Sequence, residues 1–350
     1  VAETETTTEK AAPPNAQAVR AFVAGAEQLK GGTPARLARA KELLQKAVAQ
    51  APNLWEAHYD LGLVERKLGN LDAARSALMK ARELAPTAPQ PTLALAECEF
   101  SRGELSEAMR LLQGFVEKSP DDVEARLALS AVAREQGNLE LSLSSAREVL
   151  VRDPRETRAL VEVGRVYRAQ KEYDVAELVL EKARAIDDKS AAVRNELGLL
   201  ALDRGDSQLA FTQFATAREL DARYVPAHMN QGSVLLKAGD FVAAERAYRA
   251  ALAIDASDDD AQLGLAIALR GQGKHKEAKA LYEKVLDSQP GHLAALYDLG
   301  VLQAEFLEQR KEAVGQFEKF LALAPKSDAH RASAERYVQD LKMSLGSPTP

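Results

Sequence analysis

The sequence is poor in cysteine and in aromatic residues. Cys98 is its one cysteine, so no disulfide within the chain can stabilise the fold. Aromatic residues make up 5% of the chain although hydrophobic residues make up 46%, because alanine and leucine supply most of the apolar content. Side chains of this kind suit helices that pack closely against one another. We therefore expect a helical fold that does not depend on disulfides.

Long hydrophobic runs and an excess of positive charge are also missing. No stretch reaches the roughly 20 apolar residues of a transmembrane helix, and no signal peptide is recognisable in the sequence. The net charge is −6, whereas a nucleic-acid-binding protein usually carries a basic surface. We expect a chain that neither inserts into a membrane nor binds nucleic acid.

The first fifteen residues have the composition of a disordered leader. They are rich in Thr, Glu and Pro and contain few apolar side chains that could join a core. The sequence begins with Val1 rather than methionine, which is compatible with a truncated start and with the mature end of a processed protein. We slightly favour a periplasmic or envelope-associated protein, such as a processed lipoprotein, over a cytoplasmic one.

A period of 34 residues runs through most of the chain. At the same place in eight successive units, a residue that is usually Leu precedes a small residue. These pairs are Leu61-Gly62, Leu95-Ala96, Leu129-Ser130, Val163-Gly164, Leu197-Gly198, Gln231-Gly232, Leu265-Ala266 and Leu299-Gly300. A fixed period of this size indicates a solenoid of stacked units rather than a domain around one core.

One unit, residues 55–88, predicts two helices. The first runs from about Trp55 to Leu68, where Gly69-Asn70 ends it, and the second runs from about Asp72 to Ala85, where Pro86 ends it. The second helix of each unit repeats a small residue followed four positions later by a larger one in all but one unit. The small residues are Ala74, Ala108, Ser142, Ala176, Ala210, Ala244, Ala278 and Ala313, and the residues that follow are Leu78, Leu112, Ala146, Leu180, Phe214, Tyr248, Tyr282 and Phe317. Alternating small and large residues predict that the two helices approach closely.

These features resemble the tetratricopeptide repeat family, whose 34-residue unit is a helix-turn-helix. The resemblance implies an all-α fold, an α-solenoid in the form of a right-handed superhelix, as a single domain over residues 16–345. We assign nine repeats, a capping helix at 328–345 and a tail at 346–350. The repeats are 18–54, 55–88, 89–122, 123–156, 157–190, 191–224, 225–258, 259–292 and 293–327. The first has a turn lengthened at residues 31–34, and the ninth carries one extra residue near Glu308.

No group of residues indicates an enzyme, a metal site or a cofactor site. His58 and His228 occupy the same place in repeats that are five units apart, so we interpret them as packing residues. The segment 271–275 superficially resembles a phosphate-binding loop, but it lacks the first Gly and the Ser or Thr, so it predicts a turn between helices. The acidic run 258–260 predicts a helix N-terminus rather than a calcium loop.

The resemblance implies that the first helix of each repeat lines a concave face and that ligands bind there. Its exposed places are largely apolar, with an arginine cluster in the fourth and fifth repeats. The candidate partner-binding residues are Tyr59, Leu63, Leu93, Phe100, Leu127, Arg134, Arg158, Val161, Arg165, Arg168, Asn195, Leu199, Leu202, Met229, Asn230, Leu236, Leu263, Ile267, Tyr297 and Val301.

Two interpretations of this face stay open at the level of sequence. The apolar residues form an open groove for a peptide, or neighbouring helices bury part of them. The arginines clamp an acidic partner, or Glu124, Glu135 and Glu162 neutralise them.

The expected function is a non-enzymatic scaffold that binds a peptide segment of a partner protein in the concave groove. We expect a monomer or a weak homodimer without cofactors. The alternative is a structural assembly module of a bacterial cell-envelope complex for secretion, pili or motility, and a third possibility is an enzyme on a solenoid frame.

Overall fold

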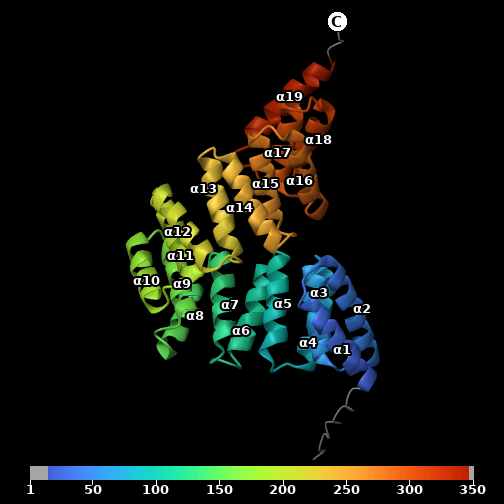
Figure 1. The fold of residues 1–350 in the computed structure, drawn as a ribbon, viewed down its shortest axis with the longest axis vertical. Helices are drawn as coiled ribbons and strands as arrows, with labels where there is room; N and C mark the ends of the chain where they lie inside the picture. Colours follow the sequence, from blue (N-terminus) through green and yellow to red (C-terminus); the bar gives the residue numbers. More distant parts are fainter. Residues whose placement is uncertain (1–14, 347–350) are drawn as a thin grey trace, which may run out of the picture. The chain divides into compact units, whose positions relative to one another are not determined.

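The computed structural model describes residues 15–346, which form 19 consecutive α-helices without a β-strand (Figure 1). Apart from Asn15 and Gly346, the predicted leader and the predicted tail lie outside the described residues. The chain divides after Val179 into two compact units.

The helices of the first unit come in antiparallel pairs along the chain. Their bounds are α1 (Ala16–Leu29), α2 (Pro34–Gln50), α3 (Trp55–Lys67), α4 (Leu71–Leu84), α5 (Pro89–Ser101), α6 (Leu105–Val116), α7 (Val123–Glu135), α8 (Leu139–Arg152) and α9 (Thr157–Ala169). Helix α10 (Tyr173–Ile186) begins in this unit and ends in the next.

The second unit continues the same pattern. Its helices are α11 (Ala191–Asp203), α12 (Ser207–Leu220), α13 (Val225–Lys237), α14 (Phe241–Ile254), α15 (Asp259–Gly271), α16 (His275–Ser288), α17 (Leu293–Glu305), α18 (Arg310–Leu323) and α19 (Arg331–Gly346). These bounds agree with the helix pair predicted for each repeat, so the α-solenoid prediction is confirmed.

The odd-numbered helices α1 to α17 are the first helices of their repeats, and we call them A helices; α2 to α18 are the B helices. Within each unit the A helices other than α9 pack on the B helix of their own repeat. Successive A helices of a unit also contact each other, as α13 contacts α15 and α15 contacts α17. Among the described residues the B helices make no contacts of comparable extent with one another. The A helices therefore form the more closely packed, inner face of each unit.

The close approach between A and B helices is built as the sequence predicts. A Cβ atom added to Gly62 would lie 2.5 Å from Leu78 Cγ, and one added to Gly300 would lie 2.9 Å from the ring of Phe317. In the fourth repeat Ser130 stands in the place of Gly62 and Ser142 in the place of Ala74, and Ser130 Oγ donates to the carbonyl oxygen of Ser142 at 2.9 Å. The hydroxyl is thus satisfied across the helix pair, where it would otherwise be a costly buried polar group.

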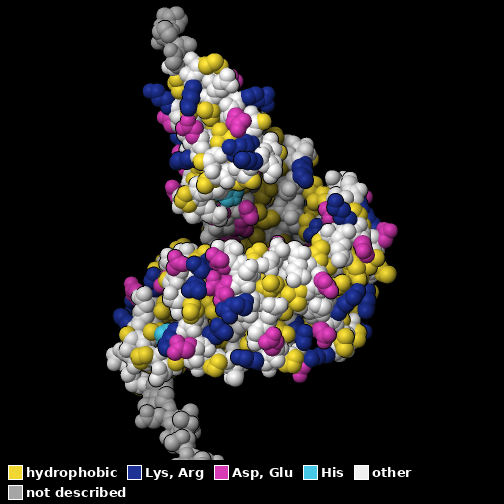
Figure 2. Space-filling model, turned by 180° about the vertical axis from the view of Figure 1, so that it is seen from behind, with side chains coloured by type: hydrophobic (Ala, Val, Ile, Leu, Met, Phe, Trp, Pro, Cys, Tyr) yellow, Lys and Arg dark blue, Asp and Glu magenta, His cyan; other side chains and the backbone are white. Residues whose placement is uncertain are grey.

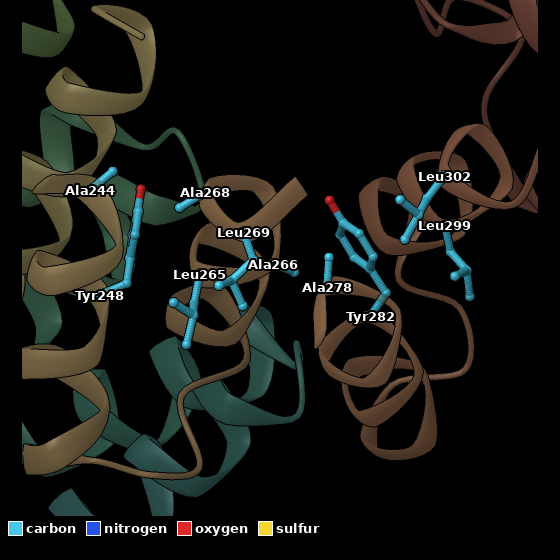
Figure 3. Packing of buried hydrophobic residues seen from close by; sticks show 10 residues of the cluster. All are labelled: Ala244, Tyr248, Leu265, Ala266, Ala268, Leu269, Ala278, Tyr282, Leu299 and Leu302. Carbon is cyan, nitrogen blue, oxygen red and sulfur yellow. The ribbon is translucent and has the colours of Figure 1, made fainter. Parts of the chain in front are cut away.

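Large side chains of the B helices also reach the following repeat. In Figure 3 the ring of Tyr248 extends from α14 toward Leu265 and Ala268 on α15, and Tyr282 extends from α16 toward Leu302. The Tyr248 ring fits between the backbones at Gly232 and Gly264, where an added Cβ would collide with it. Burial raises the pKa of Tyr248 to about 12. One aromatic side chain therefore joins three helices into a common core.

The fourth residue of several A helices ties the helix to the turn before it. His58 Nε2 donates to the carbonyl oxygen of Pro52 at 2.9 Å, and His228 Nε2 donates to that of Ala222 at 3.0 Å. Gln262 makes the equivalent bond to Ala256 at 3.0 Å. The two histidines therefore have the structural role that their shared position suggested.

The chain ends in a capping helix. Helix α19 begins at Arg331, three residues later than the start at 328 that we expected, because residues 328–330 form a turn in which Asp328 Oδ1 accepts from the His330 backbone N–H. Tyr337 stacks on Phe317 with ring centroids 4.7 Å apart. Val338 and Leu341 pack against the same cluster, so α19 covers the apolar end of the ninth repeat.

The turn between the A and B helices of a repeat contains one residue with a left-handed backbone conformation, that is, with a positive φ. In most repeats this residue is glycine. Gly137 has a φ of 83° at this place, but Lys171 adopts a φ of 62° and Glu308 a φ of 54°. A residue with a Cβ atom is strained in this region, whereas glycine is not.

We therefore expect Lys171→Gly to stabilise the protein by about 1 kcal/mol, the strain being relieved at some cost in backbone entropy. The reverse change, Gly137→Lys, serves as the matched control and should destabilise by a similar amount. The midpoint of urea unfolding measures both. A lower midpoint for Lys171→Gly would show that the Lys171 side chain contributes more than its backbone strain costs.

Candidate peptide-binding face

All of the predicted partner-binding residues lie on A helices. Phe100 and Arg158 are exposed, whereas Leu127, Val161 and Asn195 are buried, and the others are half-buried. The three buried residues support the face from below, and they would reach a partner only if the A helices moved. The inner face is thus partly self-packed and partly accessible.

The arginine cluster of the first unit is balanced by acidic residues. Arg165 Nη1 lies 2.5 Å from Glu162 Oε1, and Arg134 Nε lies 3.6 Å from Glu162 Oε2. Arg158 pairs with Glu124 at 2.6 Å and with Glu156 at 3.0 Å. Hydrogen bonds from Arg158 lower the pKa of Glu156, as expected for a carboxylate held in an ion pair. These contacts agree with neutralisation within the chain, the second of the two interpretations given above.

Ion pairs also join successive A helices, with the acid at the ninth residue in one pair and at the sixth residue in the other two. An arginine at the twelfth residue of an A helix pairs with an acid on the following A helix: Arg66 with Glu97 at 2.6 Å, Arg134 with Glu162, and Arg270 with Asp298 at 2.8 Å. Where the twelfth residue of an A helix is apolar, the sixth residue of the next A helix is uncharged. An example is Leu236 on α13, which is followed by Gly264 on α15. Ion pairs thus balance much of the charge on the inner face. Basic and acidic side chains are also interspersed on the side of the molecule that Figure 2 shows.

Asp60 departs from this arrangement. Gly25 and Gly62 take equivalent places against Leu44 and Leu78, so Leu29 stands on α1 where Arg66 stands on α3. Asp60 is half-buried and has no ion-pair partner among the described residues. Burial, with a smaller effect of Glu56, raises its pKa to about 6.

The second unit has an apolar strip on its inner face, formed by Met229, Leu263, Ile267, Tyr297 and Val301 on α13, α15 and α17. Each of these side chains packs on a buried cluster below it and keeps part of its surface accessible. The strip is bordered at one end by Asn230, whose Nδ2 donates to Asn195 Oδ1 at 2.8 Å. The Arg270–Asp298 pair lies along it and cancels its own charge.

The described residues offer no cluster of side chains that could bind a metal on this face. Within residues 15–346 no group of three or more His, Cys, Asp or Glu side chains could hold a metal ion. The segment that resembles a phosphate loop forms the turn between α15 and α16, as predicted. In the same range no helix has both the length and the hydrophobicity needed to cross a bilayer.

Comparison with known families agrees with this geometry. Sequence models described as tetratricopeptide repeat match residues 35–89, 127–191, 195–260 and 263–328, and a second such model matches residues 65–132. The chain belongs to the tetratricopeptide repeat family. Comparison with curated protein sequences gives no match.

Solved structures with the same repeat fold are similar over nearly the whole chain. Yeast Tom70 superposes with a TM-score of 0.50 at 14% identity, over 94% of this chain and 96% of that chain. A chain of the APC/C hetero-tetramer Cut9–Hcn1 gives a TM-score of 0.58 at 14% identity. The match covers 93% of this chain and 64% of that chain. At this identity the likeness shows the repeat fold.

Sequence reasoning missed several residues that shape the tetratricopeptide inner face. Arg270 and Asp298 stand at the twelfth and sixth places of successive A helices, 28 residues apart like Arg134 and Glu162. That spacing could have identified the pairs. Phe306 and His275 stack with ring centroids 4.5 Å apart. The one sequence signal for this contact is that Phe306 is an aromatic residue in the turn after α17.

The raised pKa of Asp60 gives a testable pH dependence. A carboxyl whose folded-state pKa exceeds its unfolded value binds protons more tightly when folded, so its contribution to stability is lost as the pH rises from about 4 through about 6. We expect Asp60→Asn to be more stable than the wild type at pH 7.5 by about 1 kcal/mol, allowing for partial solvent exposure. The difference should vanish towards pH 4.

Urea unfolding at pH 4 and at pH 7.5 measures this effect. Asp298→Asn is the matched control, because Asp298 occupies the same place in its repeat and pairs with Arg270. That variant should lose stability at pH 7.5. A gain in stability at both pH values for Asp60→Asn would contradict the proposed cause.

Proposed function

We propose that this protein is a non-enzymatic scaffold that holds a peptide segment of a partner protein on the inner, A-helix face of the second unit. The observation that carries the proposal is the apolar strip across α13, α15 and α17. Tetratricopeptide repeats commonly mediate protein–protein interaction, which supports the general class of function.

The strip has the form expected of a peptide-binding surface. Its side chains are fixed from below by buried residues such as Tyr248 and Leu265, so little side-chain entropy would be lost on binding. The strip crosses successive A helices, so one extended or helical segment could contact several repeats at once. Apolar anchors of that segment would lie against Leu263, Ile267 and Val301.

The charges around the strip indicate the kind of segment that fits it. Asp260 and Glu305 are exposed on α15 and α17, at the two ends of the A-helix face, and Lys237 is exposed on α13. With the Arg270–Asp298 pair neutral, acidic groups are in excess beside α15 and α17. The segment that complements this face has apolar anchors and basic rather than acidic flanks.

Substitution of the strip tests the proposal. Peptides selected from a random display library against the full chain provide the ligands, and Ile267→Asp and Val301→Asp provide the variants. Each substitution places a charge against an apolar anchor, so we expect the affinity to fall at least about ten-fold, equivalent to about 1.4 kcal/mol. Fluorescence anisotropy of the labelled peptides measures the affinity.

Val242→Asp is the matched control, because Val242 is an exposed apolar residue on the B helix α14. It should leave the affinity unchanged. The proposal is wrong if folded Ile267→Asp and Val301→Asp proteins bind the selected peptides as tightly as the wild type. Equal melting temperatures establish that the variants are folded.

A further inference from the structure

The extra residue of the ninth repeat changes the turn between its two helices. In the turns of the second to eighth repeats the backbone N–H at the end of the turn donates five residues back, as Lys274 does to Leu269 at 2.9 Å. In the ninth repeat the corresponding bond spans six residues, from Gln309 to Gln303 at 2.9 Å. Residues 306–309 therefore form a wider turn than residues 272–274.

An aromatic residue at the start of this turn lies over the preceding repeat. Phe306 takes the place held by Gln272 one repeat earlier, and its ring stacks on His275 with centroids 4.5 Å apart and planes inclined by 27°. Phe306 remains 47% exposed although it is a large apolar side chain. One face of the ring is thus covered by His275, and the rest of the side chain is accessible.

A pocket of about 390 Å³ lies beside this ring, within the second unit. The rings of Phe241, His275 and Phe306 line it, together with Ile267, Arg270 and the backbone of the turn at Gly273. The Phe241 ring lies directly on Gly271, where an added Cβ would collide with it. The pocket is at the small end of ligand-site volumes, so its size suits one side chain better than a cofactor.

The pocket is continuous with the apolar strip through shared residues. Ile267 belongs to the strip and lines the pocket. Arg270 also lines the pocket and is neutralised by Asp298 at 2.8 Å. A segment that lies along the strip can therefore turn one side chain into the pocket, where an uncharged group meets no unbalanced charge.

We propose that this pocket binds an aromatic side chain of the partner segment and so sets the specificity of the strip. Three aromatic rings supply edge and face contacts, and the guanidinium of Arg270 supplies a cation for the face of an incoming ring. This inference rests on the proposed function for its biological ligand. The pocket itself can be tested independently.

The first experiment uses single-residue probes on the full chain. N-acetyl-tryptophanamide is titrated into isotope-labelled protein, with N-acetyl-alaninamide as the matched control, and the backbone amide resonances are followed. We expect shifts at Gly271, Gly273 and His275 with the tryptophan probe alone. Phe306→Ala should abolish them, whereas Phe100→Ala, which removes an exposed aromatic side chain of the first unit, should not.

The second experiment uses the peptides selected against the full chain. Selected peptides should contain an aromatic residue, and Phe306→Ala should weaken their binding by about ten-fold, equivalent to about 1.4 kcal/mol. Peptides with that aromatic residue changed to alanine should bind the wild type and Phe306→Ala equally. The melting temperature of Phe306→Ala verifies its fold.

The outcomes separate the two proposals. Suppose that Ile267→Asp abolishes peptide binding, but that Phe306→Ala weakens peptides with the aromatic residue no more than peptides with alanine in its place. The pocket proposal is then wrong and the scaffold proposal stands. If the strip variants bind normally while the tryptophan probe still shifts Gly271, Gly273 and His275, the scaffold proposal is wrong and the pocket is a site for a separate aromatic ligand. Absence of shifts at millimolar probe overturns the pocket proposal.

Discussion

The fold depends on the close approach of two helix backbones within each repeat. Small residues such as Gly62 and Gly300 leave room on the A helix, and Leu78 and Phe317 of the B helix fill that room. No unit can bury its remaining apolar surface alone, so Tyr248 and Tyr282 extend into the next repeat and couple neighbours. Stability therefore grows by addition of interfaces, and each repeat keeps its own pattern of small and large residues.

This packing also determines which face is available to a partner. The A helices contact one another along the stack, so their side chains meet on the inner face of each unit. Arginine–acid pairs such as Arg270–Asp298 join successive A helices and leave little unbalanced charge between them. Where uncharged residues such as Leu236 and Gly264 occupy these two places instead, that part of the inner face stays apolar. Affinity on the second unit would therefore come from apolar contact, and charge would act mainly at the edges.

The sequence predicted most of the fold because the determining signals are local and repeated. The helix bounds, the glycine turns and the small-to-large packing all follow from residues within one period of 34. Accessibility could not be predicted in this way, since it depends on neighbours. Leu127 and Leu263 occupy the same place in their repeats, yet Leu127 is buried and Leu263 is half-buried. The neutralisation of Glu162 could likewise not be predicted, because it depends on where the side chains of Arg134 and Arg165 lie.

The departures from the repeat have different physical consequences, and one of them lies beside a pocket. Lys171 replaces a left-handed glycine without changing the turn, since the Glu172 N–H still donates five residues back, to Tyr167. Asp60 loses only an ion-pair partner, because Leu29 replaces the expected arginine. The insertion near Glu308 alters the backbone path of the turn itself. In the same turn Phe306 stacks on His275 beside the pocket. Violations of a local rule that persist in a regular array tend to mark function. By that criterion the turn of the ninth repeat, rather than the arginine cluster, distinguishes this solenoid from a generic one.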